Sequence, residues 1–347
     1  MVSIEHKKGR LVFYLGDLKL EWVIEPRYWR NPIIGISILL LLPIALNSRP
    51  GLLSLITMAN IYACIAIPLS WQITGTARMN FGPQLFVGIG GFTSALVSIY
   101  WGWSPWQSLI STILVSLLFA LIISRLTIIA KGLYFSLLTL LLPLIFLECT
   151  MIFNNIFRGE TGLSGIVSLV DSGDVDLNYF YGCLISLAIM LLFLFIVDKV
   201  LRSRWGVYAA AINDNENVAN MLGVNVNRYK IITFTISSVM IGVSGWFLAH
   251  YFGTFAGVTF LPMQFMLKVL LVVMVGGRGE IYGCVIGAYF VALLERFLTV
   301  IGASNYILFP LILLILLLTL PEGLYGLYRT HRYKEYYPTM KVRKREL

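Results

Sequence analysis

Long uninterrupted apolar stretches dominate the hydrophobic pattern of this chain, and short polar segments separate them. About ten stretches approach the roughly 20 apolar residues that a helix needs to span a bilayer. Their residues do not alternate with a period of two, which excludes the strands of a membrane barrel. The predicted spans are 32–47, 51–71, 84–100, 106–129, 132–153, 179–198, 231–252, 264–276, 281–300 and 305–320. The pattern therefore predicts an all-α, polytopic membrane helix bundle.

Polar segments flank this bundle and interrupt it once at length. Residues 1–31 are mixed, charged and aromatic, and we expect them to form a cytoplasmic lead-in that is not a cleavable signal peptide. Residues 32–320 form the predicted transmembrane domain, with a cytoplasmic loop at 199–230. Residues 321–347 are basic and are expected to form a cytoplasmic tail.

Composition and charge support membrane residence. The 347 residues are 58% hydrophobic and 12% charged, whereas a soluble domain carries about a quarter charged residues. The net charge of +9 comes from Lys and Arg in both termini and in alternate loops. This distribution follows the positive-inside rule and places both termini in the cytoplasm. It does not indicate nucleic-acid binding.

Residues suited to catalysis or metal binding are sparse. The four cysteines lie singly in apolar runs, which favours packing over disulfides or metal ligation. The three histidines are scattered, and no HExxH, GxSxG or Walker A motif occurs. We therefore predict no metal, no cofactor and no enzymatic activity in this chain, and we expect any ATP hydrolysis to reside in another subunit.

The polar stretch 203–230 carries the signals of a short amphipathic helix. Asn213 can cap its N-terminus, Glu216 completes a capping box three residues later, and Gly223 is a natural stop. The sequence thus predicts a helix within 209–223. A helix of this kind between two membrane spans needs a surface to pack against, and in motor-driven transporters that surface is usually the motor.

Apolar residues recur on one face of this helix, at the spacing of one helical turn. The predicted ATPase-coupling residues are Asn213, Asp214, Asn215, Glu216, Val218, Met221, Leu222 and Gly223.

Two glycine-rich blocks lie in opposite halves of the chain. Small residues at such spacing let helix backbones approach closely, so they indicate either helix packing or a solute path. The residues concerned are Gly88, Gly90, Gly91, Gly276, Gly277, Gly279, Gly283 and Gly287. Their placement suggests interrupted helices and an inverted repeat.

Ionisable residues within predicted spans are costly and become functional candidates by default. We expect Glu295 and Arg296 to lie deeper in the membrane than the other charged residues do. They form either a structural pair or a functional one. Arg125, Glu148 and Lys268 lie closer to span ends, where an interfacial position is expected. No series of buried carboxylates suited to proton coupling is evident.

A long predicted external loop, 153–178, combines the turn-forming residues Gly159, Gly162 and Gly165 with three aspartates. It is either a docking surface for an external partner or a simple solvated connector.

Several sequence blocks, in order, resemble the LivM-type permease subunits of branched-chain amino acid ABC importers, a family that also includes urea and amide permeases. The similar blocks are 75–82, 88–92, 132–135, 154–155 with 161–165, 211–224, 275–279 and 283–288. The chain departs from the family pattern at Leu163, where a second glycine is usual, and at Gly82-Pro83-Gln84, where the family usually has Gly-His. It also departs at residues 141–144, where the family often has a carboxylate soon after the central Thr-Leu.

The resemblance implies a transmembrane permease subunit in the cell membrane of a prokaryote, importing branched-chain amino acids or a similar small polar solute. Implied partners are a second, LivH-like permease, two cytoplasmic ATPase subunits, an external solute-binding protein and the lipid bilayer. The helix within 209–223 would dock into an ATPase groove. A stand-alone secondary carrier or channel, and an integral membrane enzyme, are the alternatives.

Overall fold

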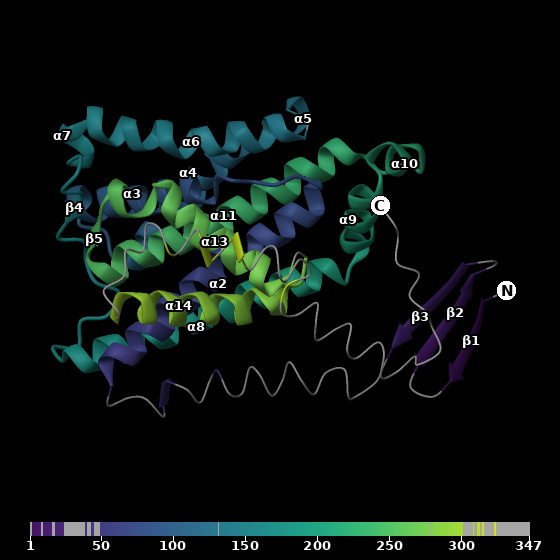
Figure 1. Cartoon of the computed structure of the whole chain (residues 1–347), viewed down its shortest axis with the longest axis horizontal. Coiled ribbons are helices and arrows are strands. Elements are labelled where there is room, and N and C mark those ends of the chain that lie inside the picture. Colours follow the sequence, from purple (N-terminus) through teal and green to yellow (C-terminus); the bar gives the residue numbers. More distant parts are fainter. Residues whose placement is uncertain are drawn as a thin grey trace. The chain divides into compact units, whose positions relative to one another are not determined.

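The computed structural model divides the chain into two compact units, residues 1–47 and 48–347 (Figure 1). The described residues are 2–7, 10–15, 18–23, 39, 43–44, 49–130, 132–277, 279–300, 308, 311–312, 314–315 and 323.

The described part of the first unit contains a three-stranded antiparallel sheet that the sequence pattern had not led us to predict. Its strands are β1 (Val2–Lys7), β2 (Arg10–Leu15) and β3 (Leu18–Val23), in that order. Leu15 pairs with Leu18, so β2 and β3 form a hairpin with two residues between them. Those residues are Gly16 and Asp17, a composition typical of tight hairpins.

The second unit is a helix bundle. Its long helices are α2 (Pro50–Thr76), α3 (Pro83–Trp101), α4 (Pro105–Ser124), α6 (Leu133–Ile152), α8 (Val175–Leu201), α11 (Val226–Phe252), α13 (Met263–Gly276) and α14 (Ile281–Val300). Shorter elements are α5 (Leu126–Ile129), α7 (Asn154–Phe157), α9 (Arg204–Asp214), α10 (Glu216–Met221) and α12 (Gly257–Phe260), with strands β4 (Leu163–Ser164) and β5 (Thr254–Phe255). In Figure 1, α9 and α10 lie at one end of the bundle, and β4 and β5 lie at the other.

The predicted bundle is confirmed in its described part, where eight helical segments are long and apolar enough to cross a membrane. They correspond to the eight spans predicted between residues 51 and 300, with ends that differ by a few residues. The two remaining predicted spans, 32–47 and 305–320, lie almost wholly outside the described residues. A total of ten spans stays a prediction.

The two glycine-rich blocks do not interrupt spans, and that expectation was wrong. Gly88, Gly90 and Gly91 of the first block lie inside α3, which continues unbroken from Pro83 to Trp101. The second block contains the connection between α13 and α14, and its last two glycines lie inside α14. The glycines of both blocks therefore lie within continuous helices or at the α13–α14 connection, and not at breaks within a span.

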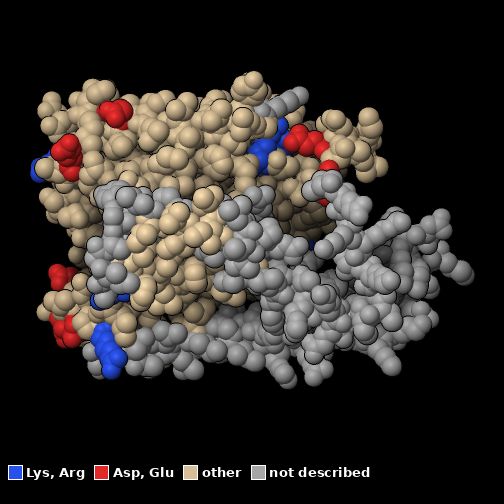
Figure 2. All heavy atoms as spheres, viewed as in Figure 1, with Lys and Arg blue, Asp and Glu red and all other residues tan. Residues whose placement is uncertain are grey.

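Burial distinguishes central helices from peripheral ones. The most apolar windows of α2 and α11 are 78% and 72% buried, whereas those of α4–α5 and α6 are 33% and 28% buried. On the face of the described bundle that Figure 2 shows, the visible charged side chains gather toward its two ends, with an uncharged belt between them. This distribution suits helices that face lipid along the belt and water at both ends.

The central helices α3 and α11 pack with their backbones in direct contact. A Cβ atom added at Gly90 would lie far inside van der Waals contact with the carbonyl of Gly242, and one at Gly245 would do the same with the carbonyl of Val87. Glycine is needed here because backbone atoms cannot move aside as a flexible side chain can.

We predict that Gly90→Ala destabilises the bundle by roughly 1–3 kcal/mol, because the added methyl group forces α3 away from α11. The measurement is thermal denaturation of the detergent-solubilised protein, which should show a lower Tm. Gly51→Ala is the matched control, since no atom lies within 4 Å of the Cβ position at Gly51. Equal Tm values for the two variants would contradict this packing.

Candidate functional site

The predicted helix within 209–223 is two helices, α9 and α10, and not one. The break is at Asn215, whose backbone is extended (φ −161°, ψ 113°). Its side-chain oxygen accepts hydrogen bonds from the backbone N–H groups of Asn217 (3.0 Å) and Val218 (3.3 Å). Asn215 is therefore the N-cap. Asn213, which we had predicted as the cap, lies inside α9.

The predicted stop at Gly223 is confirmed. Gly223 has φ +87°, a conformation that favours glycine. Its N–H donates to the carbonyl of Asn220 (3.0 Å), and the next N–H, of Val224, donates back to Ala219 (3.1 Å). These bonds close the C-terminus of α10 in the manner of a Schellman turn.

Glu216 does not form the predicted capping box. Its carboxylate forms ion pairs with two cations instead. One carboxylate oxygen pairs with Lys230 Nζ, and the other lies 3.8 Å from Arg78 Nη2. The side chains of Arg78 and Lys230 are 5% and 2% exposed, whereas that of Glu216 is 36% exposed. Because a buried cation without a counter-charge is strongly destabilising, Glu216 is held in this position. We call Arg78, Glu216 and Lys230 the ion cluster.

Arg78 extends the ion cluster to a third part of the bundle. Its Nη1 donates hydrogen bonds to the carbonyls of Thr127 and Ala130, at the end of α5. Its guanidinium also lies over the ring of Phe135 in α6, at 6.0 Å from the centroid. Burial lowers the pKa of Arg78, and the charge of Glu216 opposes that shift. Arg78 thus joins α10 to the connection between α5 and α6.

The connection between α2 and α3, which carries Arg78, is itself fixed by hydrogen bonds. Asn80 Nδ2 donates to Gln72 Oε1 (2.8 Å), and Ser136 Oγ donates to the carbonyl of Met79 (2.8 Å). Arg78 therefore has little freedom to follow a displaced Glu216.

An apolar contact completes the attachment of α9 and α10. The ring of Trp205 stacks on that of Tyr229 at 5.2 Å, and the Tyr229 hydroxyl donates to the carbonyl of Trp205 (2.9 Å). Tyr229 also belongs to a buried apolar cluster, whose other members are Ala209, Ile212, Ala219 and Val226. Both short helices are packed on the N-terminal end of α11.

The opposite face of α10 is apolar and exposed. Val218, Met221 and Leu222 are 50%, 86% and 76% exposed. We call these three residues the α10 apolar face. Exposed polar residues surround it, namely Asn213, Asp214, Asn217 and Asn220. Large exposed apolar side chains within a polar rim are typical of a protein-binding surface.

The predicted glycines lie at close contacts between helices. Gly90 meets α11, Gly88 and Gly91 face the side chains of Leu261 and Phe255, and Gly276 meets Gly283 on α14. The remaining positions lie nearby: Gly277 and Gly279 have positive φ in the α13–α14 connection, and Gly287 faces the carbonyl of Val272.

The predicted pair of Glu295 and Arg296 is not an ion pair. Glu295 Oε1 lies 2.5 Å from Lys268 Nζ, and its Oε2 accepts a hydrogen bond from the Tyr62 hydroxyl (2.8 Å). Arg296 is exposed, because adjacent helical residues point about 100° apart. Glu148 and Arg125 are exposed, as expected for interfacial charges.

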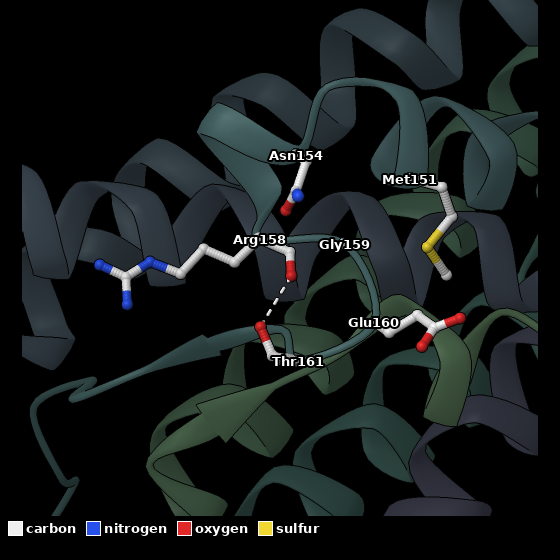
Figure 3. A pocket seen from close by; sticks show the side chains of 6 residues that line it. All are labelled: Met151, Asn154, Arg158, Gly159, Glu160 and Thr161. Atoms are coloured by element: carbon white, nitrogen blue, oxygen red, sulfur yellow. Dashed lines mark hydrogen bonds between the residues drawn. The ribbon is translucent and has the colours of Figure 1, made fainter.

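A second candidate site lies at the β4–β5 end, within the loop that we had considered as a docking surface. A cavity of about 350 Å³ is lined by Met151, Asn154, Arg158, Gly159, Glu160 and Thr161. Thr161 Oγ1 donates to the carbonyl of Arg158 (2.8 Å), which ties the loop to itself. Figure 3 shows the guanidinium of Arg158 extended away from Met151 and Glu160.

The described residues offer binding and mechanical linkage but no assembled catalytic chemistry. Within them, no group of three or more His, Cys, Asp or Glu side chains could hold a metal ion. The four cysteines are free thiols. What the α9–α10 end provides is an exposed face whose position is fixed by buried charge.

Three functional candidates escaped sequence reasoning. Arg78 and Lys230 were counted among the basic loop residues and belong to the family-like blocks, but neither was given a role of its own. Tyr62 lies in an apolar run. A cation directly after a span, near polar Asn80, was the available signal for Arg78. No local signal connects Arg78 with Glu216, because 138 positions (216 − 78) separate them.

We predict that Glu216→Gln loosens α10 and leaves the membrane helices folded. Two buried cations, Arg78 and Lys230, would lose their ion pairs with Glu216, at a cost of roughly 1–3 kcal/mol given the partial exposure of Glu216. Amide hydrogen exchange within α10 should accelerate about 5–150-fold, the ratio that corresponds to this free energy. Asp214→Asn, which removes an exposed carboxylate two residues away, should leave exchange unchanged. Equal exchange in both variants would refute a role for the ion cluster.

Comparison with known proteins agrees with this architecture. The LivM high-affinity branched-chain amino acid permease of Salmonella typhimurium strain LT2 is 23% identical over 79% of this chain and 70% of its own length. The fructose import permease FrcC of Rhizobium meliloti is 28% identical over 39% of each chain. The LivH permease of Escherichia coli K12 is 28% identical over 36% of this chain and 40% of its own.

No solved structure matches the chain significantly. Residues 51–319, which include all eight candidate spans apart from Pro50, match the family described as "Branched-chain amino acid transport system / permease component". This multi-pass membrane protein therefore belongs to the family of branched-chain amino acid transport permease components.

Proposed function

We propose that the chain is the membrane permease of an ATP-driven importer and receives the force of ATP hydrolysis at the α10 apolar face. The observation that carries the proposal is an exposed apolar helix face fixed in place by a buried ion cluster. A surface of this kind needs a partner, and its rigid attachment lets a partner move the bundle.

A separate motor is required because the sequence has no Walker A motif. We infer that two cytoplasmic ATPase subunits supply it, one of which takes Met221 and Leu222 into a groove. The polar rim around these residues, including Asp214 and Asn217, would keep the free surface soluble.

The ion cluster supplies a route from the docked helix into the membrane. Displacement of Glu216 acts on Lys230 at the start of α11 and on Arg78 between α2 and α3. Through Arg78 it also acts on the carbonyls that end α5. Alternation between outward and inward access follows if the ATPases bind one bundle conformation more tightly than the other.

Charge supports a cytoplasmic position for the α9–α10 end. The basic residues there are Arg78, Lys199, Arg202, Arg204, Arg228 and Lys230. At the β4–β5 end, four carboxylates accompany two arginines: Glu160, Asp171, Asp174 and Asp176 with Arg49 and Arg158. With ten spans, both termini lie in the cytoplasm. An inverted repeat within those spans is part of the same proposal.

The proposed solute is a branched-chain amino acid or a similar small polar molecule, as in the relatives named LivM and LivH. The proposed assembly includes a second, LivH-like permease and an external solute-binding protein, which would meet the loops at the β4–β5 end. A stand-alone carrier is the remaining alternative, and it would need no partner at the α10 apolar face.

The experiment that tests the function is purification of the tagged chain from its native membrane. We expect two ATPases and a second permease to co-purify, identified by mass spectrometry, and ATP hydrolysis to rise when the binding protein and solute are added. Recovery of the chain alone, without associated ATP hydrolysis, would favour the stand-alone carrier.

We predict that Met221→Asp uncouples the importer. Its side chain is 86% exposed, so the isolated chain should remain as stable as the wild type, whereas a charge in the apolar contact should weaken ATPase binding at least about tenfold. ATPase co-purification and solute uptake in proteoliposomes measure the effect. Met221→Leu, which keeps an apolar side chain, is the control. Normal uptake by Met221→Asp would reject docking at this face.

A further inference from the structure

A pair of opposite charges lies within the membrane-spanning helices and is not part of the coupling site. Lys268 is near the middle of the span formed by α12 and α13, and Glu295 is in the second half of α14. Lys268 Nζ and Glu295 Oε1 are 2.5 Å apart. Tyr62, near the middle of α2 and 1% exposed, donates its hydroxyl to Glu295 Oε2 at 2.8 Å.

Charged side chains at membrane depth cost free energy, so an ion pair there is a candidate functional site. Charged side chains within spans are rare and commonly mark a solute or ion path. The side chains of Lys268 and Glu295 are 23% and 27% exposed, so the pair is not sealed within the described bundle. An ion pair that reaches a surface at membrane depth is best accommodated where that surface is polar.

The pair also has a fixed geometry. Tyr62 holds one oxygen of Glu295, and the ring of Phe265 packs 6.2 Å from the Tyr62 ring on the α13 side. The carboxylate is therefore oriented from α2 while its other oxygen faces Lys268 on α13. Helices α2, α13 and α14 each supply one polar group to the same point.

Building on the proposed function, we propose that Lys268, Glu295 and Tyr62 form a recognition site for the zwitterion of an α-amino acid on its way across the membrane. The ammonium group of Lys268 binds the α-carboxylate of the solute. The carboxylate of Glu295, held by Tyr62, binds its α-ammonium group.

Charge balance favours this class of solute. Without solute, the two residues neutralise each other. With a zwitterion between them, one ion pair is replaced by two, and the total charge at the site stays zero. A neutral solute such as a sugar would have to separate the pair without replacing either counter-charge, which would leave two partly buried charges unpaired.

The decisive variant is the double substitution Lys268→Met/Glu295→Gln, in the importer reconstituted in proteoliposomes with its ATPases and binding protein. It removes both charges and leaves neither ion unpaired, so a purely structural pair should be replaceable with little effect. We expect uptake of labelled L-leucine to fall at least about tenfold, with assembly and basal ATP hydrolysis retained. Arg296→Gln, the neighbouring exposed charge, is the matched control and should transport normally.

Two results would overturn the site and leave the importer intact. One is L-leucine uptake by the double variant at the wild-type rate. The other is a wild-type complex that imports D-fructose with ATP but not L-leucine. A wild-type complex that imports neither with ATP would overturn both the site and the proposed function.

Should the double variant fail to accumulate, Tyr62→Phe decides the matter, because it removes one hydroxyl and keeps the ring. We expect it to raise the KM for L-leucine about threefold or more, with the maximal rate of ATP hydrolysis unchanged. A merely structural hydroxyl would change stability but not KM, so an unchanged KM overturns the proposal.

Discussion

The balance of charge around Glu216 is the constraint on which the α9–α10 end depends. Arg78 and Lys230 are withdrawn from water, and a cation in that position requires a nearby anion. Glu216 meets the requirement only if α10 begins where it does and turns this residue inward. The same orientation of α10 exposes the side chains of Met221 and Leu222. Burial of charge and exposure of the apolar face are therefore two results of one orientation.

The bundle next to the α9–α10 end is rigid where α3 packs against α11. Backbone contact between α3 and α11 at Gly90 and Gly242 leaves no soft side-chain layer between them. Lys230 lies on α11, and Arg78 precedes α3, so the ion cluster connects to both helices of this contact. Under the proposed function, a push on α10 would reach the central helices, while α4 and α6 lie largely exposed at the periphery.

Sequence reasoning located the spans well, because a long continuous apolar run has few alternatives to a membrane helix. It also placed the exposed apolar residues and the stop at Gly223. It failed where two distant segments decide the outcome. The local sequence does not distinguish Asn213 from Asn215 as the N-cap. Glu216 pairs with Arg78 and Lys230, which are buried cations that lie close to it only in the folded bundle. The partner of Glu295 was likewise set by packing of α13 on α14. The N-terminal hairpins were missed although Gly16-Asp17 was a usable signal.

The most direct test of force transfer at α10 is a cross-link between this helix and the motor. A cysteine replaces Met221 in a chain whose Cys149 is changed to Ser, and the assembled complex is treated with a short thiol-to-amine cross-linker. We expect a covalent product of this chain with an ATPase subunit, and we expect its yield to change when nucleotide is added. A cysteine at Trp101, at the opposite end, should give none. ATPases that co-purify but form no product at position 221 would contradict the account.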